Sequence, residues 1–148
     1  MKYNKIIFVS TDDTCRGPWA AGIMKKISGI DAESRGIISL FQEPANPRAV
    51  AVAKDNDVDI ADYMSRQLGF NDFSADTLIL VMSESMKKKI YEDFVEAENV
   101  YTIKEIGGET GDVDEVYGCE LSEYGMNFEK MEIVVKKVVE KLNMNFNN

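Results

Sequence analysis

The chain has 148 residues and a formal net charge of −9, with 45% hydrophobic and 29% charged residues. This length fits one domain with a core of its own, and so acidic a chain is not expected to bind nucleic acid or an anionic membrane through general electrostatics. There is no histidine, and the only cysteines are Cys15 and Cys119, which excludes histidine-dependent nucleophiles and histidine-based metal sites. We therefore expect no metal and no cofactor.

The first half of the chain alternates apolar runs with helical spacing. Residues 5–10 predict a strand, and a helix is expected over 18–27 with a proline in its first turn, where the missing N–H costs least. A short strand is expected at 32–37. Helices are then predicted over 46–57, where an asparagine is suited to cap the N-terminus, and over 60–67.

The second half continues the alternation. The uninterrupted apolar run at 75–82 is typical of a buried parallel strand. It is followed by a predicted helix over 83–94 and a strand at 98–103. Residues 107–119 form the longest stretch without periodicity, and from residue 121 onward the apolar residues fall on one face of a helix.

This order of elements predicts a single three-layer α/β domain, with a four-stranded parallel sheet covered by helices on both faces. In such sheets ligands bind beyond the carboxyl ends of the strands, so residues 10–17, after the first strand, are the expected site. No apolar run approaches the roughly 20 residues of a membrane span. The N-terminus does not resemble a signal peptide, and a cytoplasmic protein is expected.

Residues 10–18, STDDTCRGP, resemble the loop of the low-molecular-weight protein tyrosine phosphatases, which reads Cys-x-x-Asn/Gly-x-x-Arg-Ser after an apolar strand. Ser10 stands at the position of the nucleophilic cysteine, Arg16 at that of the phosphate-binding arginine, and Cys15 at that of a second cysteine. The segment 59–68, DIADYMSRQL, resembles the family's Asp-Ile-x-x-His-x-x-Arg-Gln-Leu segment. The resemblance covers nearly all of residues 1–148, which we expect to form one such domain with strand order 2-1-3-4.

The resemblance implies a loop that binds phosphate or a phosphotyrosine side chain. Backbone N–H groups at a helix N-terminus and an arginine fork suit an oxyanion. The expected phosphate-binding residues are Ser10, Thr11, Asp12, Asp13, Thr14, Cys15, Arg16 and Gly17. The expected catalytic residues are Ser10, Arg16 and Glu115. Arg16 could instead be a structural arginine that ties loops together.

Several positions depart from the family pattern. Ser10 has no histidine as a base, and loss of the nucleophile in a concerted site can cost about 10⁶ in rate. Glu115 stands where the family has its acidic aspartate, with Asp114 as a possible substitute. Gly17 replaces a serine whose hydroxyl assists the family's thiolate. The carboxylate of Asp12 and that of its neighbour Asp13 would each weaken the binding of an anion by about 3 kcal/mol if they lay within about 5 Å of it. The penalty is smaller if they point outward.

The roles of three further side chains can each be interpreted in two ways. Phe41 and Tyr117 fall where the family has aromatic walls around the phenyl ring, but they could be ordinary packing aromatics. Cys15 could be a redox thiol or a small buried filler. A Cys15–Cys119 pair requires the segment around Glu115 to fold over the site.

Together these features predict a phosphatase-like protein that binds a phosphoryl group but is catalytically impaired, as a monomer or weak dimer. The alternatives are an active tyrosine phosphatase whose nucleophilic cysteine was replaced by serine, and a slow phosphomonoesterase. A weaker alternative is an interaction surface with an empty loop.

Overall fold

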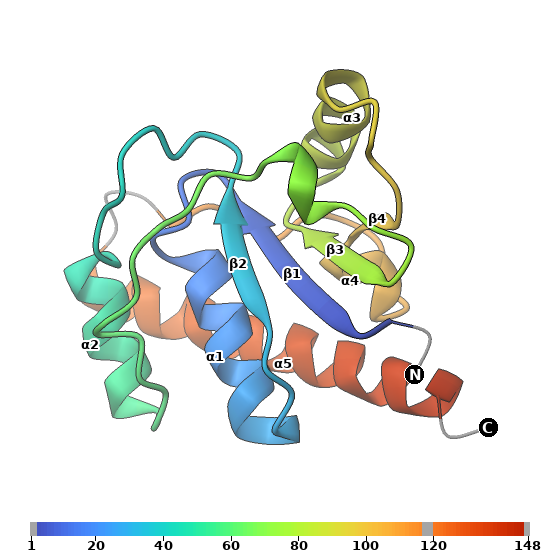
Figure 1. The fold of residues 1–148 in the computed structure, drawn as a ribbon. Helices are drawn as coiled ribbons and strands as arrows, with labels where there is room; N and C mark the ends of the chain where they lie inside the picture. The colour runs from blue at the N-terminus through green and yellow to red at the C-terminus, as the bar shows by residue number, and fades with distance from the viewer. Residues whose placement is uncertain (1–2, 117–119, 147–148) are drawn as a thin grey trace.

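The computed structural model describes residues 3–116 and 120–146. Four parallel strands form one sheet in the order β2-β1-β3-β4 (Figure 1). The strands are β1 (Lys5–Ser10), β2 (Glu33–Gly36), β3 (Thr77–Val81) and β4 (Val100–Thr102). The expected fold class and strand order are thus confirmed.

Helices cover both faces of the sheet (Figure 1). Side chains alternate along each strand, so that Ile6 and Phe8 of β1 pack into the larger apolar cluster and Ile7 and Val9 into the smaller one. The larger cluster lies under α1 (Arg16–Ser28), α2 (Pro47–Asp55) and α5 (Leu121–Phe146). The smaller cluster lies under α3 (Glu84–Asp93), and α4 (Ile103–Ile106) follows β4.

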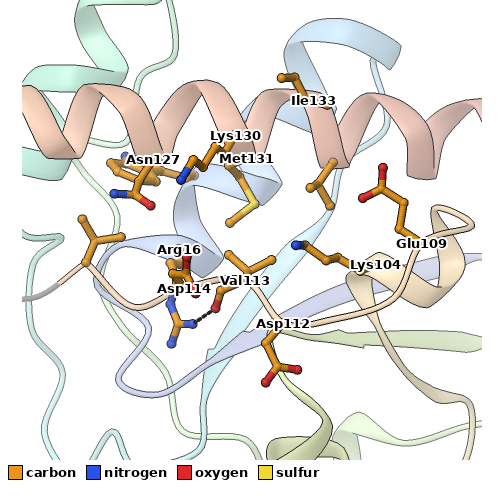
Figure 2. A pocket seen from close by; sticks show the side chains of 13 residues that line it. Arg16, Lys104, Glu109, Asp112, Val113, Asp114, Asn127, Lys130, Met131 and Ile133 are labelled. Atoms are coloured by element: carbon orange, nitrogen blue, oxygen red, sulfur yellow. Dashed lines mark hydrogen bonds between the residues drawn. The ribbon is translucent and has the colours of Figure 1, made fainter.

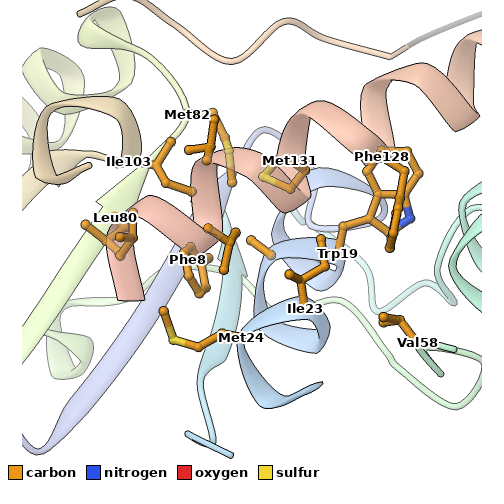
Figure 3. Close-up of a cluster of buried hydrophobic side chains, with 14 of the residues drawn as sticks. Phe8, Trp19, Ile23, Met24, Val58, Leu80, Met82, Ile103, Phe128 and Met131 are labelled. Carbon is orange, nitrogen blue, oxygen red and sulfur yellow. The ribbon is translucent and has the colours of Figure 1, made fainter. Parts of the chain in front are cut away.

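Trp19 is fully buried in the larger cluster, where it lies beside Phe128 (Figure 3). Its ring meets Tyr124 and Phe128 of α5 edge-on, with centroids 6.2 and 5.2 Å apart, and its indole Nε1 donates to the Ala49 carbonyl of α2 at 3.0 Å. Edge-to-face aromatic pairs of this kind contribute roughly 0.5–1.5 kcal/mol each beyond burial. Trp19 therefore fixes the first turn of α1 against two other helices.

Side-chain hydrogen bonds cap the starts of α2 and α3. The Asn46 side chain accepts from the Arg48 N–H at 2.9 Å, and Ser83 caps α3 by accepting from the Met86 N–H at 3.2 Å. Helix α1 begins at Arg16, earlier than expected, because the preceding loop runs directly into its first turn. Within the described residues, none of the helices combines the length and apolar character needed to cross a bilayer.

The prediction of a helix over 60–67 is wrong. This segment runs beside β2, where the Gly36 N–H donates to the Arg66 carbonyl at 2.7 Å and the Leu68 N–H donates to the Gly36 carbonyl at 2.8 Å. The backbone groups that a helix would have paired internally are used across the sheet edge instead. A short 3₁₀ turn, η1 (Phe70–Asp72), follows.

Candidate functional site

The loop 10–17 joins the end of β1 to the start of α1, at the carboxyl edge of the sheet where a site was expected. Its backbone is fixed to the chain that follows β2, because the Ser10 and Thr11 carbonyls accept from the N–H groups of Ile37 and Ile38 at 3.0 and 2.8 Å. Ser10 is the last residue of β1 and Arg16 the first of α1. The turn between them brings both side chains to one cavity.

This loop cavity is small, about 10 Å³. Its lining residues are Ser10, Thr11, Asp12, Cys15, Arg16 and Val116. Ser10 is only 2% exposed, and its Oγ has no hydrogen-bond partner among the described residues. A buried hydroxyl without a partner costs roughly 1–3 kcal/mol, so Ser10 is placed to bond a group that enters the cavity. The volume suits about one water molecule, and a phosphate requires the cavity to widen.

Arg16 closes the cavity from the side of the 112–116 segment. Its Nη1 donates to the Val113 carbonyl at 2.9 Å and its Nη2 to Thr11 Oγ1 at 3.2 Å. Glu115 Oε1 lies 3.9 Å from Nη2 and accepts from Thr11 Oγ1 at 3.4 Å. The guanidinium thus ties two loops together in this state. Of the three predicted catalytic residues, Ser10 and Arg16 line the cavity, and Glu115 contacts Arg16 and Thr11 without lining it.

The two loop aspartates are placed differently. Asp12 Oδ1 accepts from the Thr14 N–H and the Thr14 Oγ1 at 3.2 and 2.8 Å, which folds this carboxylate back onto its own loop. Asp13 has a left-handed backbone, with φ of 64°, and is fully buried. Asp13 therefore does not face outward, and it does not line the cavity either.

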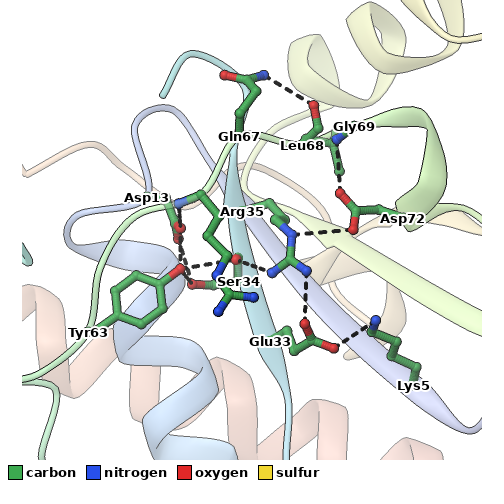
Figure 4. Close-up of polar contacts among 11 residues, drawn as sticks. Lys5, Asp13, Glu33, Ser34, Arg35, Tyr63, Gln67, Leu68, Gly69 and Asp72 are labelled. Atoms are coloured by element: carbon green, nitrogen blue, oxygen red, sulfur yellow. Dashed lines mark hydrogen bonds and ion pairs between the residues drawn. The ribbon is translucent and has the colours of Figure 1, made fainter. Parts of the chain in front are cut away.

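Asp13 lies instead in a buried polar network (Figure 4). Ser34 Oγ donates to Asp13 Oδ1 at 2.5 Å, while the Tyr63 hydroxyl and the Arg66 N–H, at 2.9 Å, donate to Oδ2. Burial raises the pKa of Asp13 to about 6, although these donors and Arg35 oppose the rise. Burial and the Asp13 contact also raise the pKa of Tyr63. The network anchors the middle of the loop to β2 and to the 60–68 segment.

Sequence reasoning missed Ser34 and Tyr63 as supports of this loop. One signal was present: Asp13 stands at the family's Asn/Gly position and Tyr63 at its histidine position, so the two partners depart from the pattern together. Gly17 packs beside Ser10 and Asp13. A Cβ at Gly17 would lie 3.0 Å from Ser10 Oγ and 3.1 Å from Asp13 Oδ1, so this position has almost no room for a side chain.

The other predicted residues are placed less centrally. Phe41 is 79% exposed and does not line the loop cavity. Cys15 is half-buried at the start of α1, and Tyr117 and Cys119 lie outside the described residues. Within residues 3–116 and 120–143, no group of three or more carboxylate or cysteine side chains is placed to hold a metal ion.

Comparison with known families gives one full-length match. The family described as low molecular weight phosphotyrosine protein phosphatase matches residues 5–148. The chain belongs to this family. The described loop, sheet and helices are therefore those of a phosphatase-family protein, with a serine at the start of its loop.

Relatives in this family carry two kinds of name. A protein-arginine-phosphatase of Geobacillus stearothermophilus is 30% identical over 142 residues, covering 93% of this chain and 95% of the relative. A low-molecular-weight protein tyrosine phosphatase from T. tengcongensis is 35% identical, with a TM-score of 0.84, 93% of this chain covered and 98% of that one. A cysteine-to-serine mutant of YwlE arginine phosphatase with a phosphorylated active site serine is 28% identical, with a TM-score of 0.88 and coverage of 97% and 98%.

Proposed function

We propose that this phosphatase-family chain binds a phosphoryl group in the loop 10–17 and turns it over very slowly or not at all. The observation that carries the proposal is the Ser10 hydroxyl, buried and without a partner among the described residues, at a cavity that Arg16 also lines. Backbone N–H groups at the start of the 13-residue helix α1 add a favourable field for an anion. An incoming phosphate would accept from these donors together.

Binding requires Arg16 to exchange partners. Its guanidinium now donates to two neutral acceptors, the Val113 carbonyl and Thr11 Oγ1, and the Glu115 carboxylate lies 3.9 Å from it. A doubly charged phosphate is a stronger acceptor, and bidentate contacts between arginine and phosphate are among the strongest hydrogen bonds in proteins. We therefore expect phosphate to draw Arg16 away from Val113 and to widen the cavity.

Slow turnover follows from the chemistry of the loop. A serine hydroxyl needs a base to become a good nucleophile, and the chain has no histidine. The Asp13 carboxylate is occupied by Ser34, Tyr63 and the Arg66 N–H. Glu115, 56% exposed on its side chain, is the first candidate for proton transfer, with Asp114 as the possible substitute. The phosphorylated active site serine named for the YwlE mutant supports a second slow outcome, in which Ser10 accepts a phosphoryl group and retains it.

The phosphorylated side chain can be assigned by titration. Phe41, an exposed aromatic at the position of a family wall residue, favours the phenyl ring of phosphotyrosine, whereas Glu115, which contacts Thr11 and Arg16, suits the guanidinium of phosphoarginine. Both classes occur among the names of relatives. We propose phosphotyrosine as the ligand, and comparison of the free phosphoamino acids, with inorganic phosphate as reference, tests this choice.

The decisive experiment on catalysis compares the chain with Ser10→Cys, using para-nitrophenyl phosphate. The wild-type chain is expected to release no more product than a buffer control, or a single equivalent with mass spectrometry showing phosphorylated Ser10. Because Gly17 and Glu115 also depart from the family pattern, Ser10→Cys is expected to stay slow. Brisk hydrolysis by this variant would instead identify a phosphatase whose nucleophile was replaced. Steady turnover by the wild-type chain would identify a slow phosphomonoesterase.

A further inference from the structure

A second cavity, of about 200 Å³, lies between the 104–116 segment and helix α5 (Figure 2). We refer to it as the α5 cavity. It shares Arg16 and Val116 with the loop cavity, but neither Ser10 nor Thr11 lines it. The Val113 carbonyl holds Arg16, while Val113 also lines the α5 cavity. The two cavities are therefore neighbours with different walls, and the proposed phosphate site leaves the α5 cavity without a role.

The walls of the α5 cavity are largely apolar. Trp19, Val113, Met131 and Val134 line it, and Trp19, Met131 and Val134 are buried in the main core. Pockets for drug-sized ligands usually measure about 300–1,000 Å³. A cavity of about 200 Å³ therefore suits a smaller body, such as one aromatic ring or a short branched chain.

The charged side chains at its rim differ in whether they already have an ion-pair partner. Glu109 is paired with Lys137, whereas Asp112, which accepts from the neutral Glu84 N–H at 3.0 Å, and Asp114 have no ion pair among the described residues. Lys104 and Lys130 also line the cavity (Figure 2). Within the described part of the chain neither lysine is within ion-pair distance of a carboxylate, although Lys104 acts on Glu109 from farther away.

We propose that the α5 cavity is a binding site for a small carboxylate with an apolar body. The carboxylate would bind at the rim formed by Lys104 and Lys130, and the apolar body would lie on Trp19 and Met131. A carboxylate is favoured over a neutral group of the same shape because it would accept charge-assisted hydrogen bonds from two ammonium groups, neither of which is within ion-pair distance of a carboxylate in the described part of the chain. This site is additional to the proposed phosphate loop.

The test uses benzoate as the probe and benzamide as its neutral counterpart. Trp19 is the only tryptophan of the chain, so its fluorescence reports a ligand in this cavity. Benzoate is expected to give a saturable change, and benzamide to bind roughly tenfold more weakly, since charge-assisted hydrogen bonds contribute about 1.5–3 kcal/mol. Equal affinity for the two compounds, or no saturable change with benzoate, would overturn the proposal.

Variants then locate the bound probe. Lys104→Met and Lys130→Met are each expected to weaken benzoate binding about fivefold or more, as loss of a charged contact predicts. Lys136→Met is the matched control, because Lys136 is exposed on the same helix but does not line the cavity. If both cavity variants bind benzoate as tightly as the wild-type chain, the assignment is contradicted. Benzoate bound in the loop cavity would give this result. An equal loss of benzoate affinity in Lys136→Met would show that the effect comes from general surface charge, and would overturn the proposal as well.

Discussion

The Tyr63 hydroxyl donates a hydrogen bond to the Asp13 carboxylate and so fastens the middle of the candidate phosphate loop to the 60–68 segment. The two residues are 50 positions apart in the chain. Ser34 of β2 and the Arg66 N–H complete the set of donors. The loop is thus shaped from behind by a buried carboxylate that does not line its cavity.

The ionisation of Asp13 is expected to make stability depend on pH. Burial raises its pKa from 3.8 to about 6, so the folded chain holds this proton more tightly than the unfolded chain. The contribution of Asp13 to the free energy of unfolding should therefore be highest below about pH 4 and fall as the pH rises through about 6. The whole difference corresponds to about 3 kcal/mol.

Asp13→Asn removes this titration and tolerates the left-handed backbone. Between about pH 4 and 7, its free energy of unfolding should lack a decrease of about 3 kcal/mol that the wild-type chain shows. Urea unfolding across this range measures the difference. Asp76→Asn, at an exposed aspartate, is the control and should keep the wild-type slope. A wild-type slope in Asp13→Asn would refute the argument.

Tyr63→Phe removes one donor from the network. We expect a loss of about 1–2 kcal/mol in the free energy of unfolding at neutral pH. Because the Tyr63 hydrogen bond lowers the pKa of Asp13, this variant should also move the pH-dependent decrease to higher pH. Urea unfolding at several pH values measures both effects, with Tyr101→Phe, at a half-buried tyrosine outside the network, as control. A shift to lower pH would contradict the assigned role of Tyr63.

Gly17 and Gly125 both lie in helices but should respond oppositely to alanine. A Cβ at Gly17 would come within 3.0–3.3 Å of Ser10 Oγ, Asp13 Oδ1 and Ser34 Cβ, whereas a Cβ at Gly125 meets nothing within 4 Å. Gly125→Ala should gain up to about 1 kcal/mol from helix propensity. Gly17→Ala should lose roughly 1–2 kcal/mol from crowding and bind phosphate more weakly. Thermal unfolding compares the two variants. Equal gains in stability would show that the loop can shift to make room for the added methyl group.

Ser10→Ala should raise the stability of the phosphate-free chain. The Ser10 hydroxyl is buried without a partner among the described residues, and removing such a group recovers roughly 1 kcal/mol or more. Ser34→Ala, which deletes a hydroxyl bonded to Asp13, should instead destabilise by a similar amount. Unfolding in phosphate-free buffer measures both. A marked loss of stability in Ser10→Ala would mean that the hydroxyl already has a stabilising contact.

Much of the sheet could be predicted because its strands are continuous apolar runs. Residues 5–10 and 75–82 each contain a central strand of the sheet, and their side chains alternate between two apolar clusters. The 60–67 segment was mistaken for a helix because its local pattern is compatible with one. Its actual conformation depends on hydrogen bonds to Gly36, which local sequence does not reveal.

The site was predictable to a smaller extent. Short-range order placed Ser10 and Arg16 at one turn, since a strand and a helix flank the loop. The burial of Asp13 depends on Ser34 and Tyr63, which are 21 and 50 residues away. Likewise, nothing in the sequence indicates that Arg16 donates to the Val113 carbonyl, which determines how far the cavity is open.

The most direct test of phosphate binding is calorimetric titration of the wild-type chain with phosphotyrosine, with Arg16→Lys as a charge-preserving control. We predict saturable binding at one site per chain and no steady release of inorganic phosphate. Arg16→Lys should bind roughly tenfold or more weakly, because lysine cannot form the bidentate contact. No heat of binding at millimolar phosphotyrosine, or equal affinity in Arg16→Lys, would contradict a phosphate site built on Ser10 and Arg16.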